Sequence, residues 1–101
     1  MAKVSVVARI PAAPGKRDEL AQALQALLDS AEGEPGTLLY LLNADGADED
    51  VLWMYELYAS QEALDTHMAS PTFQSLGPVI GPFLAGRPEL HFGAPLGGKG
   101  L

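Results

Sequence analysis

The stretch LWMYELYASQEALDTHMASPTF, residues 52–73, decides the fold that this sequence predicts. Its first part alternates between two sets of side chains, which is the pattern of a β-strand. Ser60 then offers a good N-cap for a helix that runs to about Ala69. Ser70 is a second cap, and Pro71 takes the first helical position, where its missing N–H costs nothing. The stretch therefore predicts a strand, a capped helix and the start of a further helix.

The strand expected at residues 51–58 has two faces of different chemistry. One face is apolar or aromatic except for a single carboxylate, and it consists of Leu52, Met54, Glu56 and Tyr58. The other face consists of Val51, Trp53, Tyr55 and Leu57. Because alternate side chains point to opposite sides of a sheet, Glu56 interrupts a face that is otherwise suited to burial.

The rest of the chain predicts three more strands and a long helix. Residues 3–10 alternate as a strand does, and Pro11 ends the run. Residues 16–32 carry one apolar helical face, formed by Leu20, Leu24, Leu27, Leu28 and Ala31. The run TLLYLLN, residues 37–43, is too short and too apolar for a surface helix and predicts a strand covered on both faces. The run PELHF, residues 88–92, predicts a short final strand.

Residues 73–84 predict irregular helical turns. Their apolar face consists of Phe73, Leu76, Val79, Ile80, Phe83 and Leu84. The glycines and prolines at positions 77, 78, 81 and 82 break or kink a regular helix there. After the final strand, residues 94–101 predict a flexible tail, so the expected domain spans residues 1–93.

The order of these elements is that of the α+β, ferredoxin-like βαββαβ plan. In that plan the helices cover one face of an antiparallel sheet, and the strand at residues 37–43 lies at an edge. A single chain would leave that edge and the second apolar face of the sheet in water, which proteins avoid. We therefore expect a homodimer whose sheets meet on their helix-free side.

Composition and charge limit the classes of function. The 101 residues carry a formal net charge of −7, whereas a nucleic-acid-binding domain carries clustered basic residues. No apolar run approaches the roughly 18 residues that span a membrane, and no secretory signal pattern is present. The lack of cysteine excludes disulfides and thiolate chemistry. We expect a cytoplasmic protein that binds neither nucleic acid nor membrane.

His67 and Glu56 are the candidate catalytic residues. His67 shares a predicted helix face with Leu64 and Met68, so its imidazole should be at least half buried against the sheet. A neutral imidazole titrates near working pH and suits removal of a proton from a phenol or enol. Glu56 could orient His67, or act as a base itself with a pKa raised by burial. The alternative is structural: a core histidine bonded to the backbone or to Glu56, and a carboxylate that caps a helix or pairs with an arginine.

The candidates for contact with a substrate are Tyr58, Trp53, Tyr40, Met54, Phe73 and Asn43. The aromatic side chains could stack on a flat aromatic ring. Their alternative place is the core or the dimer interface, which is the common fate of aromatic residues in strands. Asn43 could bind a substrate carbonyl, or it could begin a hairpin turn.

We expect no cofactor and no metal. The acidic run NADGADED, residues 43–50, lacks the ligand spacing of a calcium loop and predicts a solvated hairpin turn. His67 and His91 are far apart in a sequence without cysteine, which is a weak basis for a metal site. The glycines form no fingerprint of a dinucleotide or phosphate site.

The sequence resembles the antibiotic biosynthesis monooxygenase domain family from residue 3 to about residue 92. The resemblance is carried by EPGTLLYLL after an amphipathic helix and, most specifically, by the spacing of Glu, aromatic, Ser, Ala, His, Ser-Pro and Phe between Glu56 and Phe73. The aromatic residue after that Glu is usually Trp in the family, where this sequence has Tyr58.

The resemblance implies a dimeric α+β barrel of ferredoxin-like subunits. It also implies a small oxygenase that oxidises quinols or polycyclic phenols with dioxygen and needs neither metal nor flavin. The pocket would lie between the sheet and the helices and contain His67 and Glu56. Heme-degrading relatives use an Asn on the first strand and a His on the last helix. This sequence has Val6 and Val7 in the first region and no His in residues 75–81, which argues against heme degradation.

Three functions are compatible with these features. The first is a cofactor-independent monooxygenase, in which a bound quinol or aromatic polyketide loses a proton to His67 and then reduces dioxygen. The second is a non-catalytic, dimeric binding or accessory protein, in which Tyr58, Met54 and His67 pack together without a cavity. The third is an isomerase on the same fold, which uses the same base without oxygen.

Overall fold

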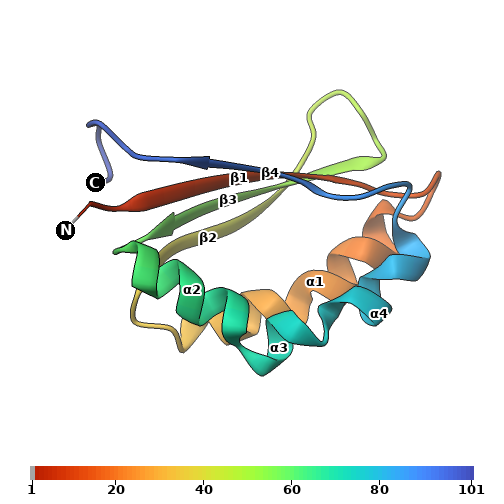
Figure 1. The fold of residues 1–101 in the computed structure, drawn as a ribbon. Coiled ribbons are helices and arrows are strands. Elements are labelled where there is room, and N and C mark those ends of the chain that lie inside the picture. Colours follow the sequence, from red (N-terminus) through yellow and green to blue (C-terminus); the bar gives the residue numbers. More distant parts are fainter. Residues whose placement is uncertain (1) are drawn as a thin grey trace.

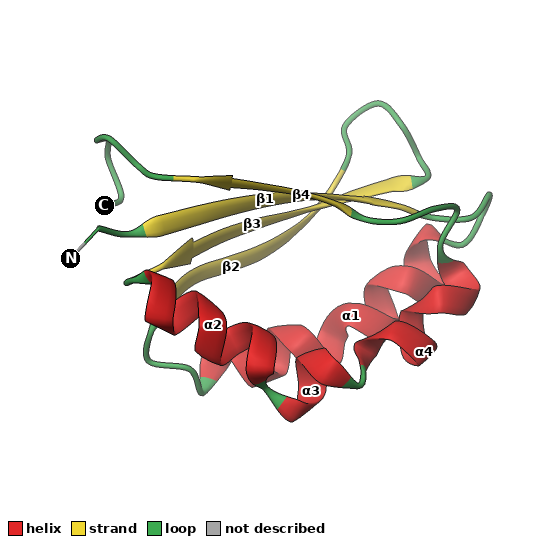
Figure 2. Cartoon of the chain, in the orientation of Figure 1, coloured by secondary structure: helices red, strands yellow, loops and turns green. Residues whose placement is uncertain are grey.

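One antiparallel sheet of four strands organises residues 2–101, the part of the chain that the computed structural model describes. The strands are β1 (Val4–Pro11), β2 (Thr37–Ala44), β3 (Val51–Tyr58) and β4 (Glu89–Gly93), in the sheet order β2-β3-β1-β4. The helices are α1 (Arg17–Glu32), α2 (Gln61–Ala69), α3 (Pro71–Gln74), α4 (Leu76–Ile80) and the short 3₁₀ helix η1 (Gly81–Phe83). The helices lie on one side of the sheet (Figure 1, Figure 2). This arrangement confirms the predicted α+β, ferredoxin-like fold with β2 at an edge.

Local hydrogen bonds explain where the helices of the central stretch begin. Ser60 Oγ accepts a hydrogen bond from the backbone N–H of Ala63 at 3.1 Å, and α2 begins at the residue after Ser60. Ser70 Oγ accepts from the backbone N–H of Phe73 at 3.2 Å, and Pro71 is the first residue of α3. Each bond satisfies a donor that the start of a helix leaves free. Both predicted helix starts are confirmed.

The hydrophobic core lies between the sheet and the helices. The buried face of α1 consists of Leu20, Leu24, Leu27 and Ala31, as the spacing predicted. On the sheet side, the buried residues are alternate side chains of β1 and the face of β3 that carries Glu56. The register pairs Glu56 with Val6 of β1 and with Tyr40 of β2. Glu56 is therefore placed on a central strand, under the helices and away from the edges of the sheet.

The opposite face of the sheet carries no helices, and it is the face that the sequence predicts to meet a second copy of the chain. In the single chain, Leu39 and Leu41 of the strand TLLYLLN are 44% and 48% exposed on this face. Tyr55, which pairs with Leu41 across β3, is 42% exposed. The reason is that β2 is an edge strand and the helices all lie on the other side (Figure 2). We name the exposed surface formed by Val7, Leu39, Leu41 and Tyr55 the helix-free face.

The segment of short helices also differs from its prediction at one position. Val79 was expected on the apolar face of these turns, but it is exposed, whereas Ile80 beside it is buried. Because α4 has only five residues, it can turn few of its side chains toward the core. None of the helices among the described residues is long and apolar enough to cross a membrane.

The last residues of the chain return toward its beginning. Residues 94–101 form neither helix nor strand, and they bend back near the N-terminal end (Figure 1). There Lys99 and Leu101 line a shallow groove together with Leu38 and Leu39. The tail therefore lies beside the helix-free face at the β2 edge.

Candidate functional site

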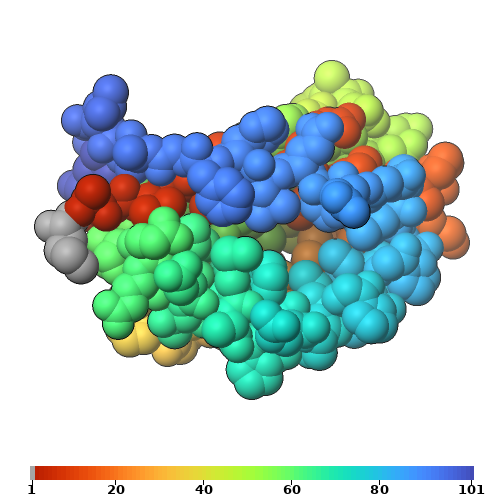
Figure 3. Space-filling model, viewed as in Figure 1, coloured from red at the N-terminus to blue at the C-terminus, as the bar shows by residue number. Residues whose placement is uncertain are grey.

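A cavity of about 220 Å³ lies between the sheet and the helices. The strands contribute Ala8, Ile10, Tyr40, Met54, Glu56 and Leu90 to its wall, and the helical segments contribute Leu24, Leu27, Phe73, Leu76 and Ile80. The space-filling view shows a small opening between the segment of α3 and α4 and the strand β4 (Figure 3). Among the described residues of the wall, Glu56 is the only carboxylate, and no lysine, arginine or histidine is present.

Glu56 is held on the cavity wall by a buried hydrogen bond. The hydroxyl of Tyr58 donates to Glu56 Oε1, and both side chains are buried. Burial raises the pKa of Glu56, while the hydrogen bond from Tyr58 acts in the opposite direction. Glu56 therefore keeps its proton to higher pH than an exposed glutamate does. A carboxyl of this kind can exchange a proton with a ligand.

Two tyrosines beside Glu56 remain protonated. Burial raises the pKa of Tyr40, and the charges of Glu56 and Glu34 raise it further. Burial also raises the pKa of Tyr58, and the hydrogen bond to Glu56 adds to this effect. Both hydroxyls are therefore hydrogen-bond donors at neutral pH, and neither can serve as a base.

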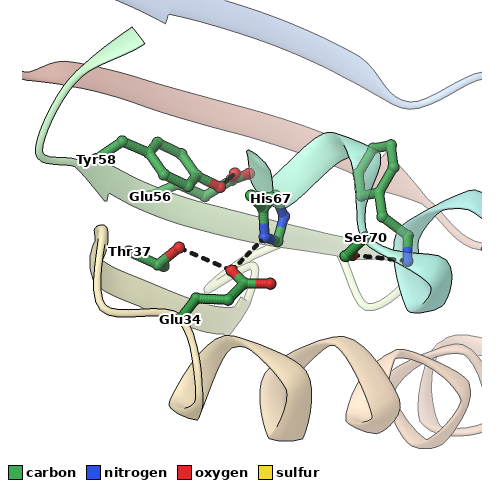
Figure 4. Close-up of polar contacts among 7 residues, drawn as sticks. Glu34, Thr37, Glu56, Tyr58, His67 and Ser70 are labelled. Carbon is green, nitrogen blue, oxygen red and sulfur yellow. Dashed lines mark hydrogen bonds and ion pairs between the residues drawn. The ribbon is translucent and has the colours of Figure 1, made fainter. Parts of the chain in front are cut away.

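His67 is a second buried polar group, one layer behind the cavity. Its side chain is 1% exposed, and its Nδ1 lies 2.7 Å from Glu34 Oε1. Thr37 Oγ1 donates to the same oxygen at 2.8 Å. Glu34 and Thr37 approach the imidazole from one side, and Glu56 with Tyr58 lies on another (Figure 4).

Aromatic rings surround the imidazole of His67. The ring centroids of Tyr40, Tyr58 and Phe73 lie 4.9, 5.4 and 5.5 Å from its own. Its second nitrogen, Nε2, is fully buried and has no hydrogen-bond partner among residues 2–101. A buried polar atom of this kind costs about 1–3 kcal/mol unless something satisfies it. Nε2 is therefore a candidate contact for a ligand.

The cavity gathers some of the residues that the sequence nominated. Its wall includes Glu56, Tyr40, Met54 and Phe73. Tyr58 and His67 lie behind the wall, where Tyr58 bonds to Glu56 and His67 packs against Tyr40 and Phe73. The nominated residues thus form a shell of wall residues with two supporting side chains behind it.

Trp53 and Asn43 do not belong to this shell. They pair across β3 and β2, on the side of the sheet opposite to Glu56. Trp53 Nε1 donates to Asp45 Oδ1 at 2.7 Å, and Asn43 Nδ2 donates to the carbonyl of Leu41 at 3.0 Å. Their side chains are engaged with the hairpin and with β2, so neither can touch a ligand in this cavity.

Glu34 is the site residue that sequence reasoning missed. The sequence suggested that Glu56 orients His67, but the carboxylate in contact with the imidazole is that of Glu34. Glu34 lies in the turn between α1 and β2, 33 positions before His67. A glutamate before a Pro-Gly turn is ordinarily a surface residue, so its type and neighbours carried no signal of this partner.

The acidic hairpin is held by its own hydrogen bonds. Asp45 Oδ2 accepts from the backbone N–H groups of Asp48 at 2.7 Å and Ala47 at 3.0 Å. The bonds from Asp48, Trp53 and Ala47 lower the pKa of Asp45 to about 2. Within residues 2–101, no group of three or more His, Cys, Asp or Glu side chains is placed to hold a metal ion. The hairpin has the bonding of a solvated turn.

Comparison with known proteins identifies the family to which this chain belongs. Residues 3–76 match the family model described as antibiotic biosynthesis monooxygenase. This chain belongs to the antibiotic biosynthesis monooxygenase family. The matched region contains Glu34, Glu56 and His67, and it ends before β4.

Three relatives show how closely the chain resembles other proteins. It is 32% identical to Putative monooxygenase Rv0793 of Mycobacterium tuberculosis over 93 residues. This aligned stretch covers 92% of this chain and 91% of that protein. The solved structure of that relative has a TM-score of 0.86 and covers 96% of this chain and 98% of its own. A Caulobacter crescentus structure that carries the family name has a TM-score of 0.89 at 31% identity, and it covers 95% of this chain and 92% of its own. An uncharacterised Synechocystis protein is 26% identical over 70 residues, 69% of this chain, and the chain covers 48% of that relative's length. The family and the fold suggested by the sequence are thereby confirmed.

Proposed function

We propose that this member of the family is a cofactor-independent monooxygenase that oxidises a quinol or polycyclic phenol with dioxygen. The observation that carries the proposal is a single carboxyl group with a raised pKa, that of Glu56, on the wall of an otherwise apolar cavity. Further support comes from the family and from the Mycobacterium tuberculosis relative, whose name places it among monooxygenases. An apolar cavity with one proton acceptor suits a substrate that supplies its own electrons.

The cavity favours a small, neutral and planar substrate. Its volume of about 220 Å³ lies below the roughly 300–1,000 Å³ of common ligand pockets, which favours one or two fused rings over larger polycycles. The described wall residues include no lysine or arginine to bind a carboxylate or phosphate group. Phe73 and Tyr40 offer aromatic surfaces on which a flat ring can stack.

In the proposed reaction, Glu56 takes the hydroxyl proton of the substrate and leaves an electron-rich anion. Tyr58 donates to Oε1 of Glu56, so the second carboxylate oxygen is available to the substrate. The anion reduces dioxygen directly, and a ring methylene of the keto tautomer becomes a carbonyl. One oxygen atom enters that carbonyl, and the other leaves as water with the two methylene hydrogens. The substrate therefore supplies all the electrons that dioxygen accepts.

His67, which the sequence nominated as the base, is the second candidate for this proton transfer. It packs behind Tyr40 and Phe73, outside the cavity wall, so a substrate reaches Nε2 only when one of these rings moves. Glu56 needs no such movement. We therefore assign the first proton transfer to Glu56.

Oxygen uptake with a panel of naphthoquinols and anthrones tests the proposal. Glu56→Gln should lower kcat/KM by about 10²–10⁴-fold, the usual effect of removing a general base. The matched control is Glu62→Gln, an exposed glutamate in the first turn of α2, which should leave turnover unchanged. Loss of activity in His67→Ala but not in Glu56→Gln would transfer the role of base to His67. Full activity in both variants would refute catalysis by this site.

A binding protein and an isomerase are the alternatives from the sequence. The binding hypothesis expected Tyr58, Met54 and His67 to pack together without a cavity; all three are buried, but a cavity lies beside them and Met54 lines it. An isomerase would turn the panel over under nitrogen, whereas the proposed monooxygenase needs oxygen. Binding without turnover in either atmosphere would identify a binding protein.

We also propose that the protein acts as a homodimer. Support comes from the helix-free face, where apolar side chains stand exposed beside the edge strand β2. A second copy of the chain can cover such a surface, which a single soluble domain rarely leaves open. Light scattering after size-exclusion chromatography at micromolar concentration should give twice the mass of one chain, and a stable single copy would contradict the proposal.

A further inference from the structure

The imidazole of His67 lies between two different environments. On one side, Nδ1 is 2.7 Å from Glu34 Oε1, an oxygen that also accepts a hydrogen bond from Thr37. On the other side, Nε2 is fully buried and has no partner among residues 2–101. Buried polar groups in proteins are almost always hydrogen-bonded, so an unsatisfied nitrogen beside a ligand cavity calls for a partner.

The contact with Glu34 discriminates between the three protonation states of the ring. A hydrogen on Nε2 alone would leave Nδ1 and the carboxylate oxygen facing each other as two acceptors at 2.7 Å. Hydrogens on both nitrogens would leave a charged ring with a buried N–H that lacks an acceptor. A hydrogen on Nδ1 alone lets the ring donate to Glu34 and leaves only one open lone pair, at Nε2. The state with hydrogen on Nδ1 alone therefore leaves the least hydrogen-bonding capacity unsatisfied, because only the lone pair of Nε2 lacks a partner.

We propose that Glu34 is a positioning residue that holds His67 as the Nδ1–H tautomer and thereby keeps Nε2 as an acceptor for a hydroxyl group of the substrate. This inference rests on the proposed function, because it takes the ligand of the cavity to be the hydroxyaromatic substrate. The site then offers two polar contacts, Glu56 on the wall and Nε2 behind it. A quinol has two hydroxyl groups and can satisfy both, whereas a simple phenol can satisfy only one.

Phe73 lies between the cavity and the imidazole of His67. Its side chain lines the cavity, and its ring lies edge-on to the imidazole at a centroid distance of 5.5 Å. Phe73 belongs to the four-residue helix α3, which is joined to α2 through Ser70. Because Phe73 is on a short helix and not on a strand, we expect that a rotation of its ring can open the cavity toward His67 while the sheet stays in place.

The tautomer can be measured in the free protein by ¹⁵N NMR of the imidazole nitrogens. At neutral pH we expect His67 to carry hydrogen on Nδ1 and none on Nε2, and the exposed His91 provides an internal reference. Glu34→Ala should shift His67 toward the Nε2–H tautomer that free imidazoles favour. Glu32→Ala, at the exposed end of α1, is the matched control and should change nothing. Hydrogen on Nε2 in the unaltered protein would overturn the proposal.

A second variant guards against a folding defect in Glu34→Ala. Thr37→Val keeps a β-branched residue in β2 and removes only the hydroxyl that donates to Glu34. The carboxylate then loses one of its restraints, so we expect a mixture of the two tautomers of His67. An unchanged Nδ1–H signal in both Glu34→Ala and Thr37→Val would show that the tautomer does not depend on Glu34.

The role of Nε2 as an acceptor is tested with naphthalene-1,4-diol under nitrogen, where no oxidation occurs. We expect the Nε2 resonance of His67 to shift as the diol binds, while His91 stays unchanged. The mono-hydroxyl analogue 1-naphthol should bind about tenfold more weakly, the effect of losing about 1.4 kcal/mol of one hydrogen bond. A diol that does not bind, or that binds without moving the Nε2 resonance, would overturn the acceptor role.

The two proposals fail in distinguishable ways. Neither NMR measurement depends on oxygen or turnover, so each can succeed in a protein that does not oxidise the panel. An Nδ1–H tautomer with no oxygen uptake would count against the monooxygenase and leave the role of Glu34 in place. Oxygen uptake in a protein whose Nε2 carries hydrogen would count against the role of Glu34 and leave the monooxygenase in place.

Discussion

Tyr58→Phe tests the hydrogen bond that holds Glu56 on the cavity wall. The substitution removes one hydroxyl from a fully buried ring and leaves Glu56 Oε1 without its donor. A hydrogen bond to a charged group contributes about 1.5–3 kcal/mol, and a bond between neutral groups contributes about 0.5–1.5 kcal/mol. We therefore expect the free energy of unfolding to fall by about 2 kcal/mol where Glu56 is ionised and by about 1 kcal/mol where it is protonated.

The pH dependence is set by the direction of the pKa shift. Because burial raises the pKa of Glu56 above its unfolded value, its contribution to stability is fully present below the unfolded pKa and is lost as pH rises through the folded pKa. The Tyr58 hydroxyl lowers this pKa, so its removal raises the pKa further. The variant should therefore lose more stability than the unaltered protein as pH increases.

Urea unfolding at about pH 5 and about pH 8 measures this difference. The loss caused by Tyr58→Phe should be larger at the higher pH. Tyr55→Phe, on the helix-free face, is the matched control and should cost little at either pH. In a Glu56→Gln background the effect of Tyr58→Phe should no longer depend on pH. An equal loss at both pH values in the unaltered background would refute the assignment of this bond to an ionisable Glu56.

Three further predictions concern the frame around the site. A Cβ on Gly36 would lie 2.6 Å from the Cβ of Ala63, so Gly36→Ala should destabilise the protein by about 1–3 kcal/mol in thermal unfolding, whereas Gly46→Ala meets open space and should not. Leu39→Lys puts a charge on the exposed helix-free face and should convert the proposed dimer into single chains in light scattering. The pKa of Asp45 is lowered to about 2, so the stability that it contributes is present above its unfolded pKa and is lost as pH falls toward 2. Asp45→Asn should therefore flatten the fall of the melting temperature between about pH 5 and pH 2.5, followed by circular dichroism, and an unchanged slope would contradict the role of this carboxylate.

Much of the fold can be predicted from local signals in the sequence. The alternation in residues 51–58 placed Glu56 and Trp53 on opposite sides of the sheet, and the structure keeps them there. Ser60 and Ser70 marked two helix starts because a cap bonds to a backbone N–H only three residues away. The open face of the sheet beside β2 also followed from the order of the elements, because the ferredoxin-like plan places its helices on one side of the sheet.

Part of the candidate site can also be predicted from pattern. The single carboxylate on a buried strand face identified Glu56, and helical spacing identified His67 as a residue turned toward the sheet. Their separate places, one on the cavity wall and one behind it, depend on how the Phe73 and Tyr40 rings pack between them. The packing of these two rings is fixed only when the helices and the sheet come together, so the local sequence does not predict it.

The sequence by itself determined the strands, the helices, their order and the buried faces, because periodicity and capping act between residues that are close along the chain. Only the tertiary structure decided that the turn after α1 delivers Glu34 to the imidazole of His67, 33 positions later, and leaves Nε2 without a partner among residues 2–101. That contact forms only when the α1–β2 turn and helix α2 are packed at the same end of the sheet. The geometry of this contact depends on how separate elements pack together, and no local sequence pattern predicts it.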